Sequence, residues 1–141
     1  MLSLVGPLGA GKTAFVKGLA QGLGLDPAAV GSPTFVIACE YPLPGGRRLG
    51  HVDLYRVGSE EELEAAGFLD LLVPGVVLAI EWADRIPEAL PADHLEVSIQ
   101  RGAGAGAEER RIVVRPTGPT ACELEERWAR ALADEGIPLS R

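Results

Sequence analysis

One short stretch near the start of the chain limits what it can fold into more than any other. Residues 6–13 read G-P-L-G-A-G-K-T, the complete pattern G-x-x-x-x-G-K-T of a phosphate-binding loop. An apolar run, Met1–Val5, comes directly before it, and Lys12–Leu23 carries apolar residues at helical spacing directly after it. A strand, a glycine loop and a helix in this order are the context that such a loop requires. The stretch therefore predicts an α/β fold.

The residue types in the loop explain how it would hold phosphate. Phosphate oxygens need backbone N–H donors, and glycine leaves their approach open. The helix that follows points its positive end at the anion. Lys12 can reach the β- and γ-phosphates, and the Thr13 hydroxyl can bind Mg²⁺. We expect nucleotide phosphates to contact the whole loop: Gly6, Pro7, Leu8, Gly9, Ala10, Gly11, Lys12 and Thr13.

The rest of the chain predicts a mixed sheet within a single domain, residues 1–141, because one domain is the default at this length. The apolar run Val76–Ile80 is typical of a strand buried on both faces, as in a parallel sheet. Thr34–Leu43 and Arg47–Tyr55 are predicted to form a β-hairpin. Alternating apolar residues predict two more strands, at 95–99 and after 111, joined by a flexible turn at 102–107.

Two capping boxes predict two further helices. Ser59 with Glu62 is expected to begin a short helix that ends near Gly67. Thr120 with Glu123 is expected to begin the last helix in the same way.

Composition excludes several classes of protein. The net charge of −7 argues against a protein that grips nucleic acid through its own basic surface. No apolar run approaches the roughly 18 residues of a membrane span, and the start does not resemble a signal peptide, so we expect a cytoplasmic protein. Cys39 and Cys122 match no metal or redox spacing and are expected to be reduced thiols.

Two acidic residues are candidates for the chemistry that follows phosphate binding. Glu81 stands at the carboxyl end of the run Val76–Ile80, where ligands of open α/β sheets bind. Asp53 stands near the end of another extended segment. Each has a simpler interpretation, a strand-end acid that faces solvent or pairs with an arginine.

Four other residues have competing interpretations. Thr34 lies in the segment that senses the γ-phosphate in many proteins with such a loop, although a plain turn explains it nearly as well. Trp82 could stack on a base or a partner, but a core position is the simpler explanation. His51 is interpreted as structural rather than catalytic, and His94 as a surface residue.

The motifs together resemble the TsaE family, small P-loop ATPases of bacterial threonylcarbamoyladenosine biosynthesis. The resemblance covers residues 1–115 and rests on five motifs in family order: GPLGAGKT at 6–13, SPTF at 32–35, HVDLYR at 51–56, EELEAAGFLD at 61–70 and IEWADRIPEALP at 80–91. It implies a three-layer P-loop NTPase-like α/β domain with a mixed sheet and an antiparallel portion.

The resemblance also implies roles for single residues. Gly6 to Thr13 would bind ATP, and Thr13 would ligate Mg²⁺. Glu81 would be an acid associated with the metal, and Asp53 a second essential acid near the metal and the γ-phosphate. Thr34 would belong to the nucleotide-sensing switch, and Trp82 would lie beside the site. Lys12, Asp53 and Glu81 are therefore the predicted catalytic residues.

The family's activity implies a partner. Its members act on the TsaB–TsaD pair, which transfers threonylcarbamoyl to the adenosine next to the anticodon of tRNA, and ATP hydrolysis would reset that complex. Any contact with tRNA would occur within the complex.

Two features depart from the family pattern. Pro7 stands where relatives usually carry an acid, and it removes one N–H from the loop. Relatives also usually have a further helix and strand ahead of Met1. Two explanations are open, a start codon further upstream, which we favour, or a shortened member.

Three other functions are possible for a chain with such a loop. A small-molecule kinase would need an acceptor pocket and a mobile lid, for which the chain has little room. A GTP-dependent switch typically carries an N/T-K-x-D motif, which is absent here because lysine occurs only at 12 and 17. A non-catalytic nucleotide sensor would bind ATP without turnover.

Overall fold

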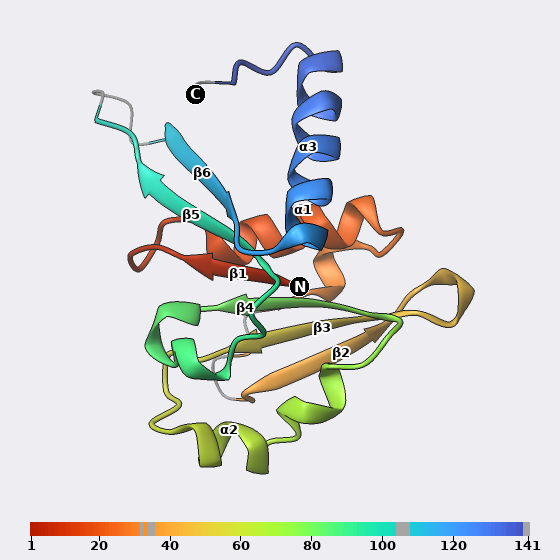
Figure 1. Cartoon of the computed structure of the whole chain (residues 1–141), viewed down its shortest axis with the longest axis vertical. Helices are drawn as coiled ribbons and strands as arrows, with labels where there is room; N and C mark the ends of the chain where they lie inside the picture. The colour runs from red at the N-terminus through yellow and green to blue at the C-terminus, as the bar shows by residue number, and fades with distance from the viewer. Residues whose placement is uncertain (32, 34–35, 104–107, 140–141) are drawn as a thin grey trace.

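The computed structural model describes residues 1–31, 33, 36–103 and 108–139. These residues form a six-stranded sheet in the order β2-β3-β4-β1-β5-β6 (Figure 1). The four inner strands are parallel to one another, and an antiparallel strand closes each edge. The strands are β1 (Leu2–Val5), β2 (Ala38–Pro42), β3 (Arg48–Asp53), β4 (Val76–Glu81), β5 (Leu95–Arg101) and β6 (Arg110–Pro116).

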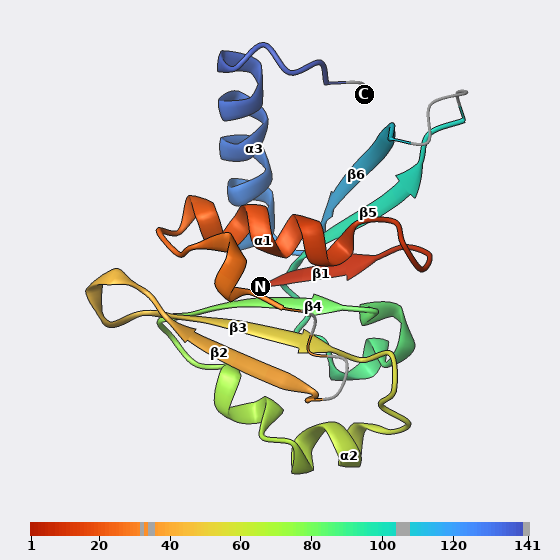
Figure 2. The same cartoon turned by 180° about the vertical axis from the view of Figure 1, so that it is seen from behind.

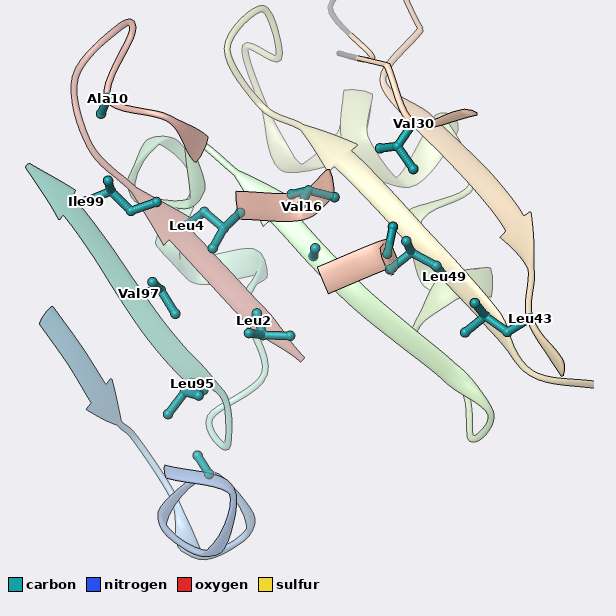
Figure 3. Packing of buried hydrophobic residues seen from close by; sticks show 13 residues of the cluster. Leu2, Leu4, Ala10, Val16, Val30, Leu43, Leu49, Leu95, Val97 and Ile99 are labelled. Atoms are coloured by element: carbon teal, nitrogen blue, oxygen red, sulfur yellow. The ribbon is translucent and has the colours of Figure 1, made fainter. Parts of the chain in front are cut away.

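Helices cover the two faces of the sheet. The α-helices are α1 (Lys12–Gly22), α2 (Glu60–Ala65) and α3 (Pro119–Asp134), and Figure 2 shows α1 lying across β1. One core cluster joins α1 and α3 to one face, and Figure 3 shows Val16 of α1 close to Leu4 of β1. The second cluster packs Leu63 of α2 and Phe68 against Val52 and other residues of the opposite face. The three layers, the mixed sheet and the antiparallel portion are therefore confirmed.

The short 3₁₀ turns complete the connections: Pro27–Ala29, Pro44–Gly46, Phe68–Leu71, Ala83–Arg85 and Pro87–Ala89. Pro44–Gly46 joins β2 to β3, so the predicted hairpin is confirmed with shorter strands. Within the described residues, no helix is long and apolar enough to cross a membrane.

The parallel register brings three strand ends to one edge of the sheet. Asp53, the last residue of β3, stands opposite Glu81, the last residue of β4. Leu4 of β1 stands opposite Glu81 on its other side, and the glycine loop begins just after β1. Ligands of open α/β sheets bind at this carboxyl edge. The fold therefore places both predicted acids beside the phosphate-binding loop.

Of the two predicted helix caps, the one at the start of α2 is confirmed and the one at the start of α3 is wrong. Ser59 accepts a hydrogen bond from the Glu62 N–H as predicted, and α2 follows it. The prediction for Thr120 was wrong, because α3 begins at Pro119 with Gly118 as its N-cap, and Gly118 has no side chain to accept a bond. Asp93, from the loop before β5, accepts from the N–H groups of Thr120 and Ala121 at 2.9 Å each. A distant carboxylate thus replaces the local cap.

We predict that Asp93→Ala lowers the melting temperature at neutral pH by a few degrees, because two N–H groups at the start of α3 lose their acceptor. The hydrogen bonds from Ala121 and Thr120 lower the pKa of Asp93. The stabilisation is therefore present above the ordinary pKa of the carboxyl and is lost as pH falls through the lowered one. Thermal melts across pH measure it. Glu123→Ala is the control. An equal fall in its melting temperature would mean that the local capping box of Thr120 and Glu123, and not Asp93, stabilises the start of α3.

Candidate nucleotide-binding site

The glycine loop is closed by its own backbone and by β5. Ala10 N–H donates to the Pro7 carbonyl at 3.1 Å, and Phe15 N–H donates to the Gly11 carbonyl at 2.9 Å. A side chain at Gly6 would collide with the carbonyl oxygen of Ile99 in β5, so only glycine fits there. Gly11, which caps α1, has a φ of 109°, a conformation that favours glycine. The loop therefore has the strand–loop–helix geometry that its sequence predicts.

Lys12 is buried and directed at the loop that precedes it. Its Nζ donates to the carbonyls of Gly6 at 2.6 Å and Pro7 at 3.0 Å. The same Nζ lies 3.7 Å from the centroid of the Trp82 ring, a cation–π contact. Burial lowers the pKa of Lys12, and the nearby carboxylates Glu81 and Asp53 act in the opposite direction. The ammonium group is thus held at the place where phosphates would bind.

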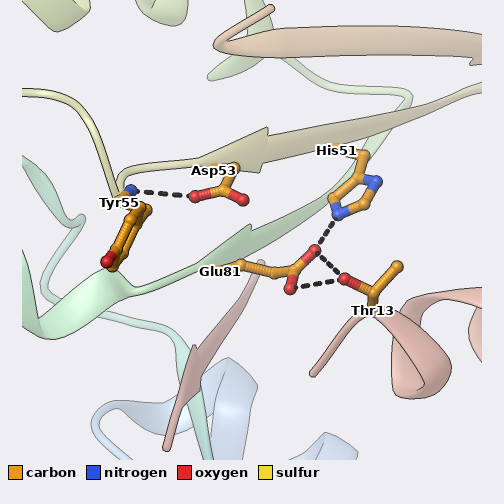
Figure 4. Close-up of polar contacts among 5 residues, drawn as sticks. All are labelled: Thr13, His51, Asp53, Tyr55 and Glu81. Atoms are coloured by element: carbon orange, nitrogen blue, oxygen red, sulfur yellow. Dashed lines mark hydrogen bonds and ion pairs between the residues drawn. The ribbon is translucent and has the colours of Figure 1, made fainter. Parts of the chain in front are cut away.

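Glu81 joins the loop helix to the sheet. The Thr13 Oγ1 donates to its carboxylate, at 2.9 Å from Oε1 and 3.0 Å from Oε2 (Figure 4). On the other side, Nε2 of His51 lies 2.5 Å from Oε2. The Glu81 residue is only 3% exposed, which rules out a solvated strand-end acid. Thr13 of α1 and His51 of β3 are far from Glu81 in the sequence, and folding brings all three side chains into contact.

Asp53 lies next to Glu81 and is 7% exposed. Its Oδ1 accepts from the Tyr55 N–H at 2.8 Å (Figure 4). Burial raises the pKa of Asp53, the Tyr55 hydrogen bond opposes that shift, and the neighbouring charge of Glu81 adds to it. Two partly desolvated carboxylates side by side favour a cation between or beside them.

Aromatic rings form one wall of the site. Trp82 has a φ of 58°, unusual for a residue other than glycine, and its ring centroid lies 5.0 Å from that of Tyr55. The cleft has a volume of about 280 Å³ and is lined by Leu8, Gly9, Gly11, Lys12, Thr13, Ala14, Asp53, Tyr55, Glu81 and Trp82. Trp82 thus faces the cleft as well as the neighbouring core cluster.

The structure brings together eight of the residues singled out from the sequence around one cleft: Leu8, Gly9, Gly11, Lys12, Thr13, Asp53, Glu81 and Trp82. Thr34, the predicted switch residue, lies outside the described residues. His94 is half-buried near Pro91, away from this cluster. Cys39 and Cys122 are both free thiols, as expected.

Sequence reasoning missed three side chains around the site. Tyr55 lies in the motif HVDLYR at 51–56, which was the available signal in the sequence, and the structure packs its ring against Trp82. Arg110 Nε donates to the Ala10 carbonyl at 2.9 Å, and the Arg101 guanidinium lies against Gly9. Nothing in the local sequence connects these arginines to a loop about a hundred residues earlier.

The oxygen donors present fit Mg²⁺. In the described part of the chain, no group of three or more His, Cys, Asp or Glu side chains is placed to hold a metal alone. Mg²⁺ instead is usually bound through one or two carboxylates, waters and substrate phosphates. The Thr13 hydroxyl and the buried carboxylates of Glu81 and Asp53 supply such donors beside the loop.

We predict that Asp53→Asn stabilises the protein when metal and nucleotide are absent, by about 0.5–2 kcal/mol at neutral pH. The change removes a buried charge while the amide oxygen can still accept from Tyr55 N–H. Because the pKa of Asp53 is raised in the folded state, Asp53 lowers the stability of the protein above that raised pKa. Below the ordinary pKa of the group, it has no effect on stability. The advantage therefore disappears as pH falls through this range.

Urea unfolding in EDTA from pH 3.5 to 8 measures the difference. Asp70→Asn is the matched control, because it removes one negative charge from an exposed position. Equal stabilisation in both variants would mean that net charge, and not the burial of Asp53, explains the effect.

Comparisons with known proteins agree with this geometry. The family model described as "Threonylcarbamoyl adenosine biosynthesis protein TsaE" matches residues 1–112. A Streptomyces coelicolor protein named tRNA threonylcarbamoyladenosine biosynthesis protein TsaE is 43% identical over 133 residues, which is 93% of this chain and 84% of the relative. A Bacillus subtilis protein of the same name is 43% identical over 118 residues, 84% of this chain and 70% of the relative.

A solved structure shares the fold as well as the sequence. The crystal structure of Bacillus subtilis YdiB is 37% identical, covers 92% of this chain and 76% of its own, and has a TM-score of 0.67. The motifs, the sheet with its glycine loop and these matches lead to one conclusion: the chain belongs to the TsaE family.

Proposed function

We propose that this protein is a Mg²⁺-dependent ATPase that serves the threonylcarbamoylation of tRNA by acting on a TsaB–TsaD pair. Proteins of the TsaE family function in tRNA threonylcarbamoyladenosine biosynthesis. The observation that carries the proposal is the contact of Thr13, in the phosphate-binding loop, with the buried carboxylate of Glu81. This contact places a hydroxyl, a carboxylate and the Lys12 ammonium around one cleft.

The loop residues would bind the phosphates. Backbone N–H groups of residues 6–13 and the N-terminus of α1 favour an anion. Lys12 would exchange its carbonyl partners on Gly6 and Pro7 for phosphate oxygens and stabilise the negative charge that develops during transfer. Pro7 has no N–H, so its part in the loop is limited to its backbone carbonyl and shape.

The acids would act on the metal side. Thr13, Glu81 and Asp53 would hold Mg²⁺, which would supply positive charge to offset that of the phosphates. Glu81 accepts a hydrogen bond from the Thr13 hydroxyl, which leaves the lone pairs of the Thr13 oxygen available to a metal. Asp53, held by the Tyr55 N–H, is positioned to orient a water of the metal shell or the attacking water. Trp82 and Tyr55 would limit the access of bulk water on this side.

The partner assignment follows from the family and from charge. A net charge of −7 does not suit independent binding to tRNA, so we place the tRNA contact on the TsaB–TsaD pair. We propose that the whole reaction takes place in the cytoplasm. Among the described residues, no arginine lines the cleft itself. Slow hydrolysis alone and faster hydrolysis with the pair are therefore expected.

We predict that ATP hydrolysis by the purified chain rises at least tenfold when a TsaB–TsaD pair and tRNA are added. Lys12→Ala should remove nucleotide binding and turnover together. Glu81→Ala should reduce turnover by about 100-fold and nucleotide binding much less, because the acid would act through the metal and the attacking water and not on the phosphates directly. Phosphate release and fluorescent-nucleotide titration measure the two quantities.

Glu126→Ala, at an exposed position on α3, is the control for Glu81→Ala. Full activity of both site variants would contradict the assigned roles. Nucleotide binding without turnover under every condition would favour the non-catalytic sensor, and a phosphorylated small-molecule product would favour a kinase.

A further inference from the structure

We infer that His51 is a positioning residue, which fixes the Glu81 carboxylate so that Oε1 remains available to the metal and water side of the cleft. The inference rests on the proposed function, because it concerns the same site. It goes further by assigning a role to a residue that the sequence indicated only as structural. Three observations support it: the burial of the ring, its contact with Glu81 and the surroundings of its second nitrogen.

The His51 ring is completely buried in the middle of the sheet. It belongs to β3, between Cys39 of β2 and Ala79 of β4, and is 0% exposed. A polar ring in such a place is costly unless its polar atoms find partners. Core packing alone would be served better by an apolar residue of similar size, so the contacts of the ring nitrogens have to explain its presence.

The one nitrogen with a hydrogen-bond partner points at Glu81. Nε2 of His51 lies 2.5 Å from Oε2 of Glu81, and Figure 4 shows the ring and Thr13 approaching the carboxylate from different sides. Asp53, two residues later on β3, instead accepts from the Tyr55 backbone. His51 therefore contacts the Glu81 carboxylate, while Asp53 remains beside the cleft.

The surroundings of Nδ1 indicate which ring nitrogen of His51 carries the proton. Nδ1 of His51 is buried and has no hydrogen-bond partner among the described residues. A proton on Nδ1 would be a buried donor without an acceptor, which is costly. The ring is therefore assigned as the neutral tautomer that carries its proton on Nε2 and donates it to Oε2.

This donation makes the two carboxylate oxygens unequal. Oε2 accepts from His51 and lies 3.0 Å from the Thr13 hydroxyl, while Oε1 has only the Thr13 hydroxyl at 2.9 Å. Thr13 has one hydroxyl proton to share between them. Oε1 consequently keeps spare acceptor capacity, and the His51 bond prevents the carboxylate from turning away from the loop.

The first test is a pair of substitutions assayed with the full TsaB–TsaD complex. In His51→Leu, we expect the Mg²⁺ concentration for half-maximal ATP turnover to rise about tenfold and kcat to fall, as when outer partners of metal-binding groups are removed. Nucleotide affinity measured in EDTA should stay unchanged. His51→Gln supplies an N–H at a similar reach and should recover a large part of both values.

His94→Gln is the matched control, because it changes the other histidine, which contacts Pro91 outside the cleft. A purely structural histidine would give equal losses in the Leu and Gln variants, accompanied by a lower melting temperature and weaker nucleotide binding in EDTA. That result would overturn the inference.

The second test does not depend on activity. The chain has only two histidines, so the ring ¹⁵N spectrum can be assigned with His94→Gln. We expect His51 to show the Nε2–H tautomer with a strongly deshielded ring proton, and Glu81→Ala to remove that deshielding. A proton on Nδ1, or a spectrum insensitive to Glu81→Ala, would overturn the inference.

The two tests separate this inference from the proposed function. If the wild-type protein shows no ATP turnover with its partners, the proposed function fails. Two readouts then decide the role of His51: the ring spectrum, and the Mg²⁺ concentration that tightens nucleotide binding, which should be about tenfold higher in His51→Leu than in wild type. If turnover is present, its Mg²⁺ dependence is unchanged in His51→Leu and the His51 ring spectrum is unchanged in Glu81→Ala, the positioning role fails alone.

Discussion

The hydrogen bond between the Thr13 hydroxyl and the Glu81 carboxylate is the interaction on which the site depends. It connects the first turn of α1 to the last residue of β4, and the two bonded residues are 68 positions apart in the chain. The parallel pairing of β1 with β4 makes this possible, because it sets Leu4 opposite Glu81 just before the loop begins. The sheet register, and not the loop by itself, therefore brings the acid to the phosphate-binding loop.

The same arrangement has a cost in stability. The buried polar residues of the described chain are Ser3, Lys12, His51, Asp53 and Glu81, and four of them surround the cleft and its hydrogen-bond network. Burial raises the pKa of Asp53 and lowers that of Lys12, so both groups are less easily charged than in water. Proteins tolerate such groups where ligand binding requires them, and the apolar clusters on both faces of the sheet supply the compensating stabilisation.

Local sequence was sufficient for the elements whose signals are local. The glycine loop, the buried strand β4 and the Ser59 cap were all predicted, because each depends on neighbouring residues. The predicted cap of α3 was wrong because the actual acceptor, Asp93, lies more than 25 positions before the helix in the sequence. The contact of His51 with Glu81 depends on strand pairing, so the sequence could identify both residues but could not join them.

Different side chains contact the two sides of the glycine loop, and this difference follows from the strand order. On the β3–β4 side the carboxylates of Asp53 and Glu81 end their strands. On the β5–β6 side, Arg110 donates to the Ala10 carbonyl and Arg101 lies against Gly9. A polyphosphate with a bound cation is itself asymmetric, since the cation needs acidic ligands while the phosphates need donors. The antiparallel hairpin thus does more than close an edge of the sheet, because it supports the loop with arginines opposite the acids that would receive the metal.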